Sequence, residues 1–137
     1  YRSVTASWFE NSILFDMLKY LSEKKVPVFL TTDHGTIKVN RPIKMVGERE
    51  LNTNLRYKVG RSSMDYPAKE VFEIKNPDEA FLPKESMTQR FIFATRNDFF
   101  AYQNNFNQYV NLYKNTFQHG GISMEEMMIP FVKLLPK

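Results

Sequence analysis

The chain of 137 residues is about one domain long, and its 42% hydrophobic and 15% aromatic residues exclude a disordered, collagen-like or low-complexity protein. Because it contains no cysteine, disulfide scaffolds, cysteine-ligated metals and thiol nucleophiles are excluded together. Its net charge of +4 mildly favours an anionic partner. The two histidines are thus the scarcest groups able to do chemistry, and glycine follows each of them, at His34-Gly35 and at His119-Gly120-Gly121.

The first part of the chain predicts a helix followed by a buried strand. Residues 7–25 have apolar side chains at helical spacing, with Ser7 and Glu10 forming a capping box. Residues 26–32 are a short apolar and β-branched run, which is typical of a buried parallel strand. This order indicates an α/β fold, in which ligands bind beyond the carboxyl ends of the strands, where Asp33 and His34 stand.

The remainder of the chain predicts mostly short strands. They are expected at residues 36–39, 43–46, 55–59, 71–74, 90–96 and 131–135, with a polar loop at 82–89. Apolar residues at positions 106, 109, 110 and 113 have helical spacing, although their composition also suits a strand. Ser123 and Glu126 form a second capping box, so a short helix is expected to begin there and to end before Pro130.

The organisation of the sequence is simple. No repeat or linker interrupts it, so residues 1–137 are expected to form a single unit. No apolar run approaches the roughly 18 residues that a membrane span needs, and we expect a soluble, cytoplasmic protein without a membrane partner. Because the chain starts at Tyr1, without an initiator methionine and within helical sequence, we expect it to be a piece of a longer polypeptide.

A basic segment extends from Lys38 to Arg61 and carries more than the net charge of the whole chain. Its basic residues are Lys38, Arg41, Lys44, Arg49, Arg56, Lys58 and Arg61, against Glu48 and Glu50. Arg56 and Lys58 alternate along an expected strand and so share a face, and Arg61 follows at the next turn. The segment could bind phosphate groups, or it could be a solvated sheet edge whose charges prevent association.

Both histidine motifs allow two interpretations. Asp33-His34-Gly35 places a carboxylate and an imidazole together, and both are ligands of zinc or manganese. The alternative is an Asx-type turn in which His34 is held by hydrogen bonds. His119 precedes an expected helix N-terminus, where it could ligate a metal or contact a phosphate, or it could stand incidentally in a glycine turn. None of the serines and threonines carries a recognisable nucleophile motif, so no catalytic residue is identified.

Three segments together resemble the C-terminal part of a PglZ domain, which belongs to the alkaline phosphatase superfamily. They are Thr31-Thr32-Asp33-His34-Gly35, Asn54-Leu55-Arg56-Tyr57-Lys58-Val59-Gly60-Arg61, and Phe117-Gln118-His119-Gly120-Gly121-Ile122-Ser123-Met124-Glu125-Glu126 followed by Pro130. The resemblance extends over residues 28–135 and is nearest to the PorX-type response regulators, in which a receiver domain precedes PglZ.

The resemblance implies an α/β sandwich around a mostly parallel sheet, with this chain as its C-terminal part and the basic segment as a β-rich insertion. It implies two metal ions, zinc or alternatively manganese, with Asp33 and His34 on one ion and His119 on the other. The implied substrate is a phosphoester, in this branch a phosphodiester such as an oligonucleotide or other nucleotide compound. Arg56, Lys58 and Arg61 are candidate substrate contacts on their charge pattern alone.

The superfamily also needs an N-terminal metal-binding Asp, a Thr or Ser nucleophile and a further Asp/His set, and no segment of this sequence matches them. We therefore expect the chain to be inactive alone. The rest of PglZ and a receiver domain are expected upstream, with a cognate histidine kinase as partner and a homodimer of the complete protein as a candidate assembly. The alternative is a non-catalytic basic module that binds nucleic acid or a protein and in which both histidines are structural.

Overall fold

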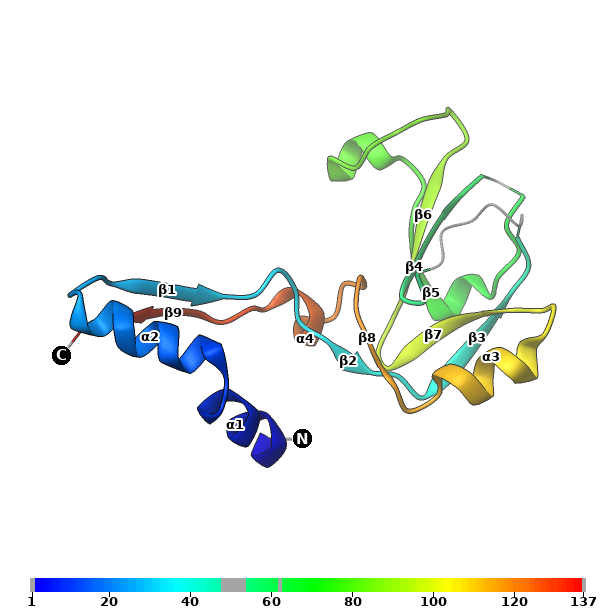
Figure 1. Cartoon of the computed structure of the whole chain (residues 1–137). Coiled ribbons are helices and arrows are strands. Elements are labelled where there is room, and N and C mark those ends of the chain that lie inside the picture. Colours follow the sequence, from blue (N-terminus) through cyan, green and yellow to red (C-terminus); the bar gives the residue numbers. More distant parts are fainter. Residues whose placement is uncertain (1, 48–53, 62, 137) are drawn as a thin grey trace. The chain divides into compact units, whose positions relative to one another are not determined.

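The computed structural model describes residues 2–47, 54–61 and 63–136, which form two compact units (Figure 1). One unit contains the described residues up to Asp33 and those from Pro130 onward, and the other runs from His34 to Ile129. The sequence predicts a single unit because no linker is visible, but the chain passes between the units twice, so no one stretch of sequence separates them. Among the described residues, no helix is long and apolar enough to cross a membrane.

The first unit consists of the helices α1 (Arg2–Glu10) and α2 (Ile13–Glu23) and the strands β1 (Val28–Thr31) and β9 (Phe131–Leu134). The sequence predicts one continuous helix here, but the helix breaks at Ser12. The Ser12 hydroxyl donates to the carbonyl of Phe9 at 2.7 Å and accepts from the backbone N–H of Phe15 at 3.3 Å. Ser12 therefore caps α2, because the first turn of a helix has N–H groups without an intrahelical partner. The capping box predicted at Ser7 and Glu10 is wrong, since Glu10 ends α1.

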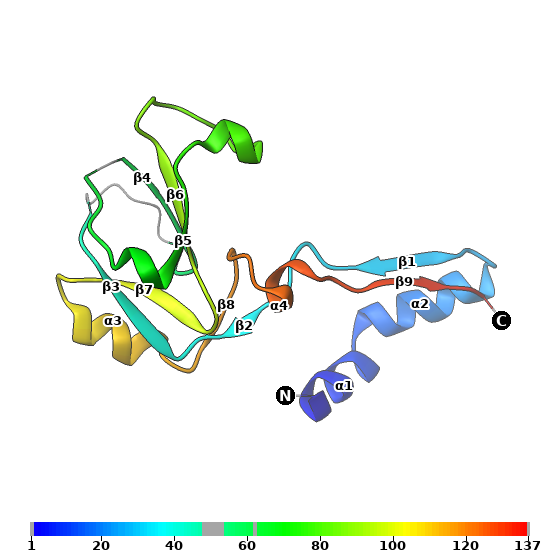
Figure 2. The same cartoon turned by 180° about the vertical axis from the view of Figure 1, so that it is seen from behind.

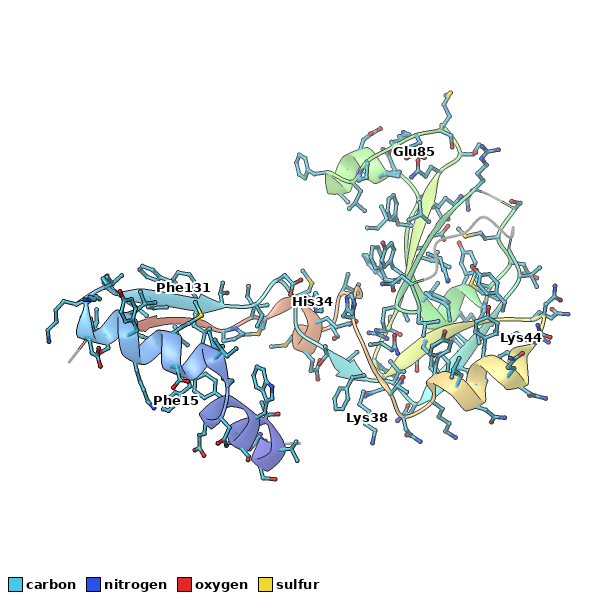
Figure 3. All side chains as sticks on the ribbon, viewed as in Figure 1. Phe15, His34, Lys38, Lys44, Glu85 and Phe131 are labelled. Atoms are coloured by element: carbon cyan, nitrogen blue, oxygen red, sulfur yellow. The ribbon has the colours of Figure 1, made fainter. Side chains whose placement is uncertain are left out.

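The strands β1 and β9 form an antiparallel ribbon, and α2 lies along it in both views (Figures 1 and 2). Phe29 of β1 stacks on Phe131 of β9, which is labelled in Figure 3, with ring centroids 5.6 Å apart. This arrangement differs from the buried parallel strand predicted for residues 26–32. The uninterrupted apolar run predicts a strand covered on both faces, yet within the described residues its only strand partner is the antiparallel β9, and Phe29 is 56% exposed.

The second unit is built from short strands around one parallel pair. Its elements are the strands β2 (Ile37–Lys38), β3 (Arg41–Met45), β4 (Tyr57–Gly60), β5 (Val71–Ile74), β6 (Arg90–Ala94), β7 (Asp98–Tyr102) and β8 (Phe117–Gln118), the 3-10 turns η1 (Ala68–Glu70) and η2 (Pro77–Ala80), and the helices α3 (Phe106–Tyr113) and α4 (Met124–Met127). Strand β3 pairs parallel with β7, β2 pairs antiparallel with β8, and β6 lies between β4 and β5, antiparallel to both. The mostly parallel sheet that the resemblance implies is therefore not seen in the part of the chain that the structure describes.

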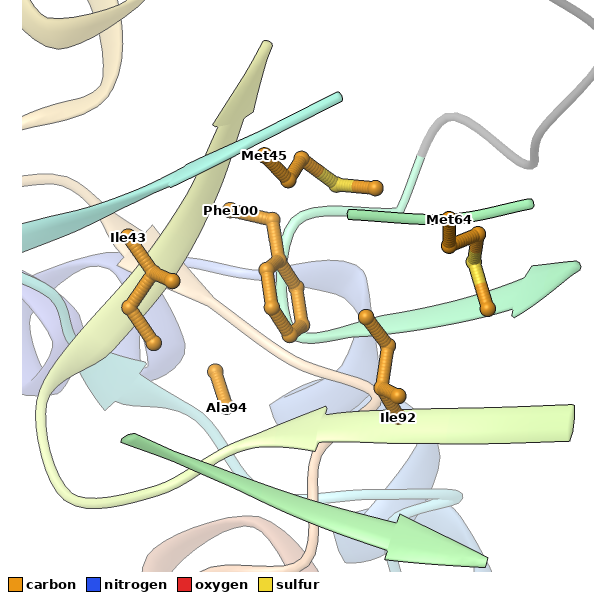
Figure 4. Close-up of a cluster of buried hydrophobic side chains, with 6 residues drawn as sticks. All are labelled: Ile43, Met45, Met64, Ile92, Ala94 and Phe100. Carbon is orange, nitrogen blue, oxygen red and sulfur yellow. The ribbon is translucent and has the colours of Figure 1, made fainter. Parts of the chain in front are cut away.

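The β3–β7 pair is the centre of this unit because it has apolar side chains packed on both of its faces. One face contributes to a cluster of Ile43, Met45, Met64, Ile92, Ala94 and Phe100 (Figure 4). The other face contributes to a cluster of Ile37, Val39, Leu55, Phe99 and Ala101, against which Phe106, Tyr109 and Tyr113 of α3 pack. The neighbours Phe99 and Phe100 enter different clusters, as the alternation of side chains along a strand requires. The pair is thus enclosed between the β4–β6–β5 sheet and α3.

Most predicted elements of the second unit and the closing strand are confirmed, with ends shifted by a few residues. The strands expected at 36–39, 43–46, 55–59, 71–74, 90–96 and 131–135 correspond to β2, β3, β4, β5, β6 and β9. The helix at positions 106–113 and the capping box of Ser123 and Glu126 are also present. Strand β7 is missed, because a strand covered on both faces has an apolar run without the alternation that identifies an edge or surface strand.

The basic segment is not a continuous exposed surface. Arg41 forms a two-pronged ion pair with the buried carboxylate of Asp98, with Nε–Oδ1 and Nη2–Oδ2 distances of 2.7 and 2.6 Å. A second carboxylate, that of Glu70, lies 3.1 Å from Arg41. The charged residues 48–50 of the segment, Arg49 included, lie outside the described residues. Part of the positive charge of this segment therefore holds strands together, because Arg41 of β3 pairs with Asp98 of β7.

Lys58, like Arg56, is a member of the basic segment whose side chain is fully buried. It stands opposite Ile92 in the β4–β6 pairing, and its Nζ lies 4.7 Å from the centre of the Tyr102 ring. Desolvation disfavours the charged ammonium and lowers the pKa of Lys58 to about 8. Folding therefore works against the protonated form of this lysine at neutral pH.

This burial predicts that the protein becomes more stable as the pH rises. The folded pKa lies below the unfolded value of 10.5, so the unfolded state binds more protons between about pH 8 and 10.5, and stability increases with pH in that window. We expect a gain of about 2 kcal/mol in unfolding free energy between pH 7 and 9.5, measured by urea unfolding. Lys58→Met should remove this slope, whereas Lys44→Met, at an exposed lysine of β3, should retain it. An unchanged slope in Lys58→Met would contradict the assignment.

Candidate functional site

His34 is the first residue of the second unit and directly follows Asp33 (Figure 3). Its ring Nδ1 lies 2.9 Å from the carbonyl oxygen of Gly35. Because a carbonyl oxygen only accepts, this contact is a hydrogen bond when Nδ1 carries the proton. A neutral His34 then has its lone pair on Nε2, the nitrogen through which it would bind a metal ion.

His119 follows β8 in a loop that one asparagine holds. The Asn54 side-chain amide donates to the carbonyl of His119 at 3.1 Å, and its oxygen accepts from the backbone N–H groups of Arg56 at 2.7 Å and Tyr57 at 3.2 Å. Gly120 has a φ of 97°, in the region that favours glycine, and a Cβ there would lie 2.4 Å from the Asn54 amide nitrogen. The path of the loop therefore depends on glycine at this position.

The imidazole rings of His34 and His119 stack face to face. Their centroids are 3.9 Å apart and their planes differ by 9°. The two residues come from separate loops of the second unit, so the fold of that unit brings them together. The sequence favours a shared site for the two histidines, because each is followed by glycine at an element boundary, but it does not show that the two side chains meet.

The glycines near both histidines lie against α4. The N–H of Gly35 donates to the carbonyl of Glu126 at 2.8 Å, and a Cβ on Gly35 would lie 1.9 Å from the carbonyl oxygen of Glu125. The N–H of Gly121 donates to Glu126 Oε1 at 2.9 Å, and a Cβ on Gly121 would lie 2.6 Å from Oε2. Glycine at these positions is therefore required by the close approach of each loop to α4.

A buried ion pair joins α4 to the segment that leads into β4. Arg56 and Glu126 are 0% and 3% exposed, and they form two parallel hydrogen bonds, Nε–Oε1 at 2.9 Å and Nη2–Oε2 at 2.8 Å. Arg56 Nη1 also donates to the carbonyl of Asp98. Desolvation alone would raise the pKa of Glu126, but the hydrogen bonds from Arg56, Ser123 and Gly121 outweigh it and hold the pKa below its ordinary value. The pair is therefore ionised and satisfied in the interior.

The histidine pair supplies part of a metal shell. Imidazole nitrogens suit zinc, but zinc in proteins has three or four protein ligands. Within residues 2–47, 54–61 and 63–136, no group of three or more His, Asp or Glu side chains is close enough to hold an ion. The described residues alone do not fit a closed zinc site, so no catalytic step through a metal follows from them.

The predicted site residues differ in burial and in their neighbours. His34 and His119 lie together, and Asp33 is exposed at the end of the segment that follows β1. Arg56 and Lys58 have no exposed surface, so we do not retain them as substrate contacts. The sequence places them on one face of a strand, but it does not show that this face is turned inward. Arg61 is exposed, and its role as a substrate contact stays a prediction.

Two residues that hold the site are not apparent from the sequence in this role. Asn54 has no motif of its own, and its contact with His119 spans 65 positions. Glu126 is predicted correctly as a helix-capping residue, and its carboxylate does accept from the N–H of Ser123 at 3.3 Å. Its buried partner Arg56 lies 70 positions away, and a pairing of that range leaves no local signal.

The chain was compared with models of known protein families and with curated proteins. The model of the BREX system PglZ alkaline phosphatase-like domain matches residues 5–134 of this chain. The match includes both histidine loops, the Arg56 segment and α4. No curated protein matches the chain.

The approach of Gly35 to α4 predicts a large cost for a single methyl group. Gly35→Ala would place its Cβ against backbone atoms of Glu125, which cannot rotate away, and we expect a loss of about 3 kcal/mol in unfolding free energy. Gly60→Ala is the matched control, because Gly60 lies in strand β4, where the extended backbone suits any residue. Equal stabilities of the two variants in chemical denaturation would contradict this account.

The buried pair predicts a non-additive pattern of stabilities. Arg56→Met leaves Glu126 as an unpaired buried charge and should cost about 3 to 5 kcal/mol of unfolding free energy. The double variant Arg56→Met/Glu126→Met removes both charges and should be less destabilised than the single one. Arg61→Met, at an exposed arginine of the same segment, should be nearly neutral. Additive losses in urea unfolding would show that the two side chains are not coupled.

Proposed function

Because the chain belongs to the PglZ family of alkaline phosphatase-like domains, we propose that it is the C-terminal portion of a metal-dependent phosphoester hydrolase. The observation that carries the proposal is the contact between His34 and His119, whose rings stack at 3.9 Å. Two imidazoles that are distant in sequence, both in glycine-containing loops held by backbone hydrogen bonds, suit a site that needs nitrogen ligands at fixed positions.

The proposed ligands are Asp33, His34 and His119, and the proposed metal is zinc, with manganese as the alternative. In the complete domain, two such ions would act as Lewis acids on a phosphoryl oxygen. They would stabilise the negative charge that develops while the phosphoryl group is transferred. The residues of this chain would hold nitrogen and carboxylate donors in place. The contact of His34 Nδ1 with the Gly35 carbonyl supports this role, because it orients the ring and directs Nε2 away from its own loop.

The remaining ligands and the hydroxyl nucleophile are proposed to belong to a part of the protein outside this sequence. Support comes from the resemblance of the three segments to PglZ, whose site includes residue types that no segment here matches. The proposed substrate is a phosphodiester, such as an oligonucleotide, with Arg61 as a candidate contact. An upstream receiver domain and a cognate histidine kinase are the proposed regulatory partners.

The competing proposal, a basic module for nucleic acid, has less support from the structure. Such a module needs exposed positive charge along a surface. Arg56 and Lys58 are buried, and Arg41 is paired with Asp98. Much of the positive charge that suggests a phosphate-binding groove in the sequence is therefore buried or paired, and is not available to a nucleic acid.

Metal binding and hydrolysis test the proposed function. The complete protein that contains this chain should bind zinc and hydrolyse bis(p-nitrophenyl) phosphate, while the 137 residues alone should not hydrolyse it. His34→Ala and His119→Ala should each weaken zinc binding at least about tenfold, measured by calorimetry, because each removes one ligand. Asp33→Asn is the corresponding carboxylate variant, and Asp16→Asn, on the exposed surface of α2, is its control.

Two outcomes would contradict the proposal. Zinc affinity that is unchanged in the His34→Ala/His119→Ala double variant would show that these residues are not ligands. Salt-dependent oligonucleotide binding that survives the loss of all three proposed ligands, in a protein without hydrolytic activity, would favour the binding module instead.

A further inference from the structure

We infer that Glu126, held by Arg56, is the positioning residue that fixes the separation of the His34 and His119 rings. Its importance for catalysis rests on the proposed function, in which both rings bind metal ions. Glu126 contacts the two histidine loops at backbone groups that follow His34 and His119. It acts through the two loops that carry them.

Glu126 binds both histidine loops with different parts of the same residue. Its backbone carbonyl accepts from the N–H of Gly35 at 2.8 Å, one position after His34. Its side-chain Oε1 accepts from the N–H of Gly121 at 2.9 Å, two positions after His119. A single residue therefore binds the backbone of both loops, within two residues of each histidine.

The linkage is rigid because each of its parts is held independently. The carboxylate cannot rotate without losing its two bonds to Arg56, which is itself fixed by the carbonyl of Asp98. The carboxylate also accepts from the N–H of Ser123, so it is fixed relative to the first turn of α4. A buried carboxylate with three kinds of partner costs free energy to move, since every lost bond leaves a desolvated charge.

Steric fit points to the same residue. The space that a side chain would need at Gly121 is filled by both carboxylate oxygens of Glu126 and by Arg56 Nε, at 2.6, 2.9 and 3.0 Å from an added Cβ. An added Cβ at Gly35 would lie even closer to α4, 1.9 Å from the backbone carbonyl oxygen of Glu125. Both loops are therefore seated on one surface, which the Arg56–Glu126 pair completes.

The experiment measures the ring contact itself, without any metal. In the wild-type 137-residue chain, we expect nuclear Overhauser contacts between the ring protons of His34 and His119. Glu126→Gln keeps the size of the side chain but removes the charge opposite Arg56, and it should abolish these contacts. Glu125→Gln is the matched control, since Glu125 is the exposed neighbour on the same helix, and it should leave them unchanged.

A second variant and a wild-type measurement separate positioning from folding. Arg56→Met/Glu126→Met removes the pair and the acceptor for Gly121 without leaving a buried charge, and it should fold but lose the ring contact. In the wild type, the amides of Gly35 and Gly121 should exchange with solvent slowly. Ring contacts that persist in either folded variant, or rapid exchange of either glycine amide in the wild type, would overturn the inference.

Zinc titration of the same variants, made in the complete protein that contains this chain, distinguishes this inference from the proposed function. If both hold, zinc binding weakens roughly 10- to 100-fold in Glu126→Gln and not in Glu125→Gln, the range expected when a partner behind a metal ligand is lost. Loss of the ring contact in Glu126→Gln together with no zinc binding in any form supports positioning and overturns the metal role. Retention of the ring contact overturns positioning, whatever the zinc affinity is.

Discussion

The buried pair of Arg56 and Glu126 is the interaction on which the histidine site depends. Two opposite charges without solvent are stable only when their remaining donors and acceptors are satisfied, and here backbone groups of Asp98, Gly121 and Ser123 complete the set. The pair thereby connects the first residue of β7, the segment before β4 and the first turn of α4. Arg56, a candidate ligand contact in the sequence, therefore serves to hold the interior together.

The core explains why this part of the molecule can hold such a pair. The parallel strands β3 and β7 are covered on both faces, and Asp98 stands at the start of β7, where its carboxylate binds Arg41 and its carbonyl accepts from Arg56. The same residue therefore anchors both the strand pair and the ion pair. The histidine loops are attached to this scaffold through Asn54 and Glu126.

Local chemistry made much of the second unit predictable. The capping box at Glu126, the helix at 106–113 and the short strands each follow from residues within one turn or one strand. The candidate ligands follow from the scarcity of histidine and from family resemblance. What the sequence could not show is direction: whether Arg56 and Lys58 face water or the core, and whether β1 has partners on one side or two. These depend on contacts between distant segments, which leave no periodic pattern.

The stacked histidines stand 85 positions apart in the chain, and the strands β2 to β8 lie between them. Bringing them together costs the entropy of closing the intervening chain, and this cost is offset only by the contacts of the assembled core. A ligand that needs both rings would therefore bind the finished unit and not its partly folded forms. The site would then act as a check on maturation, since binding capacity would appear only together with the completed core.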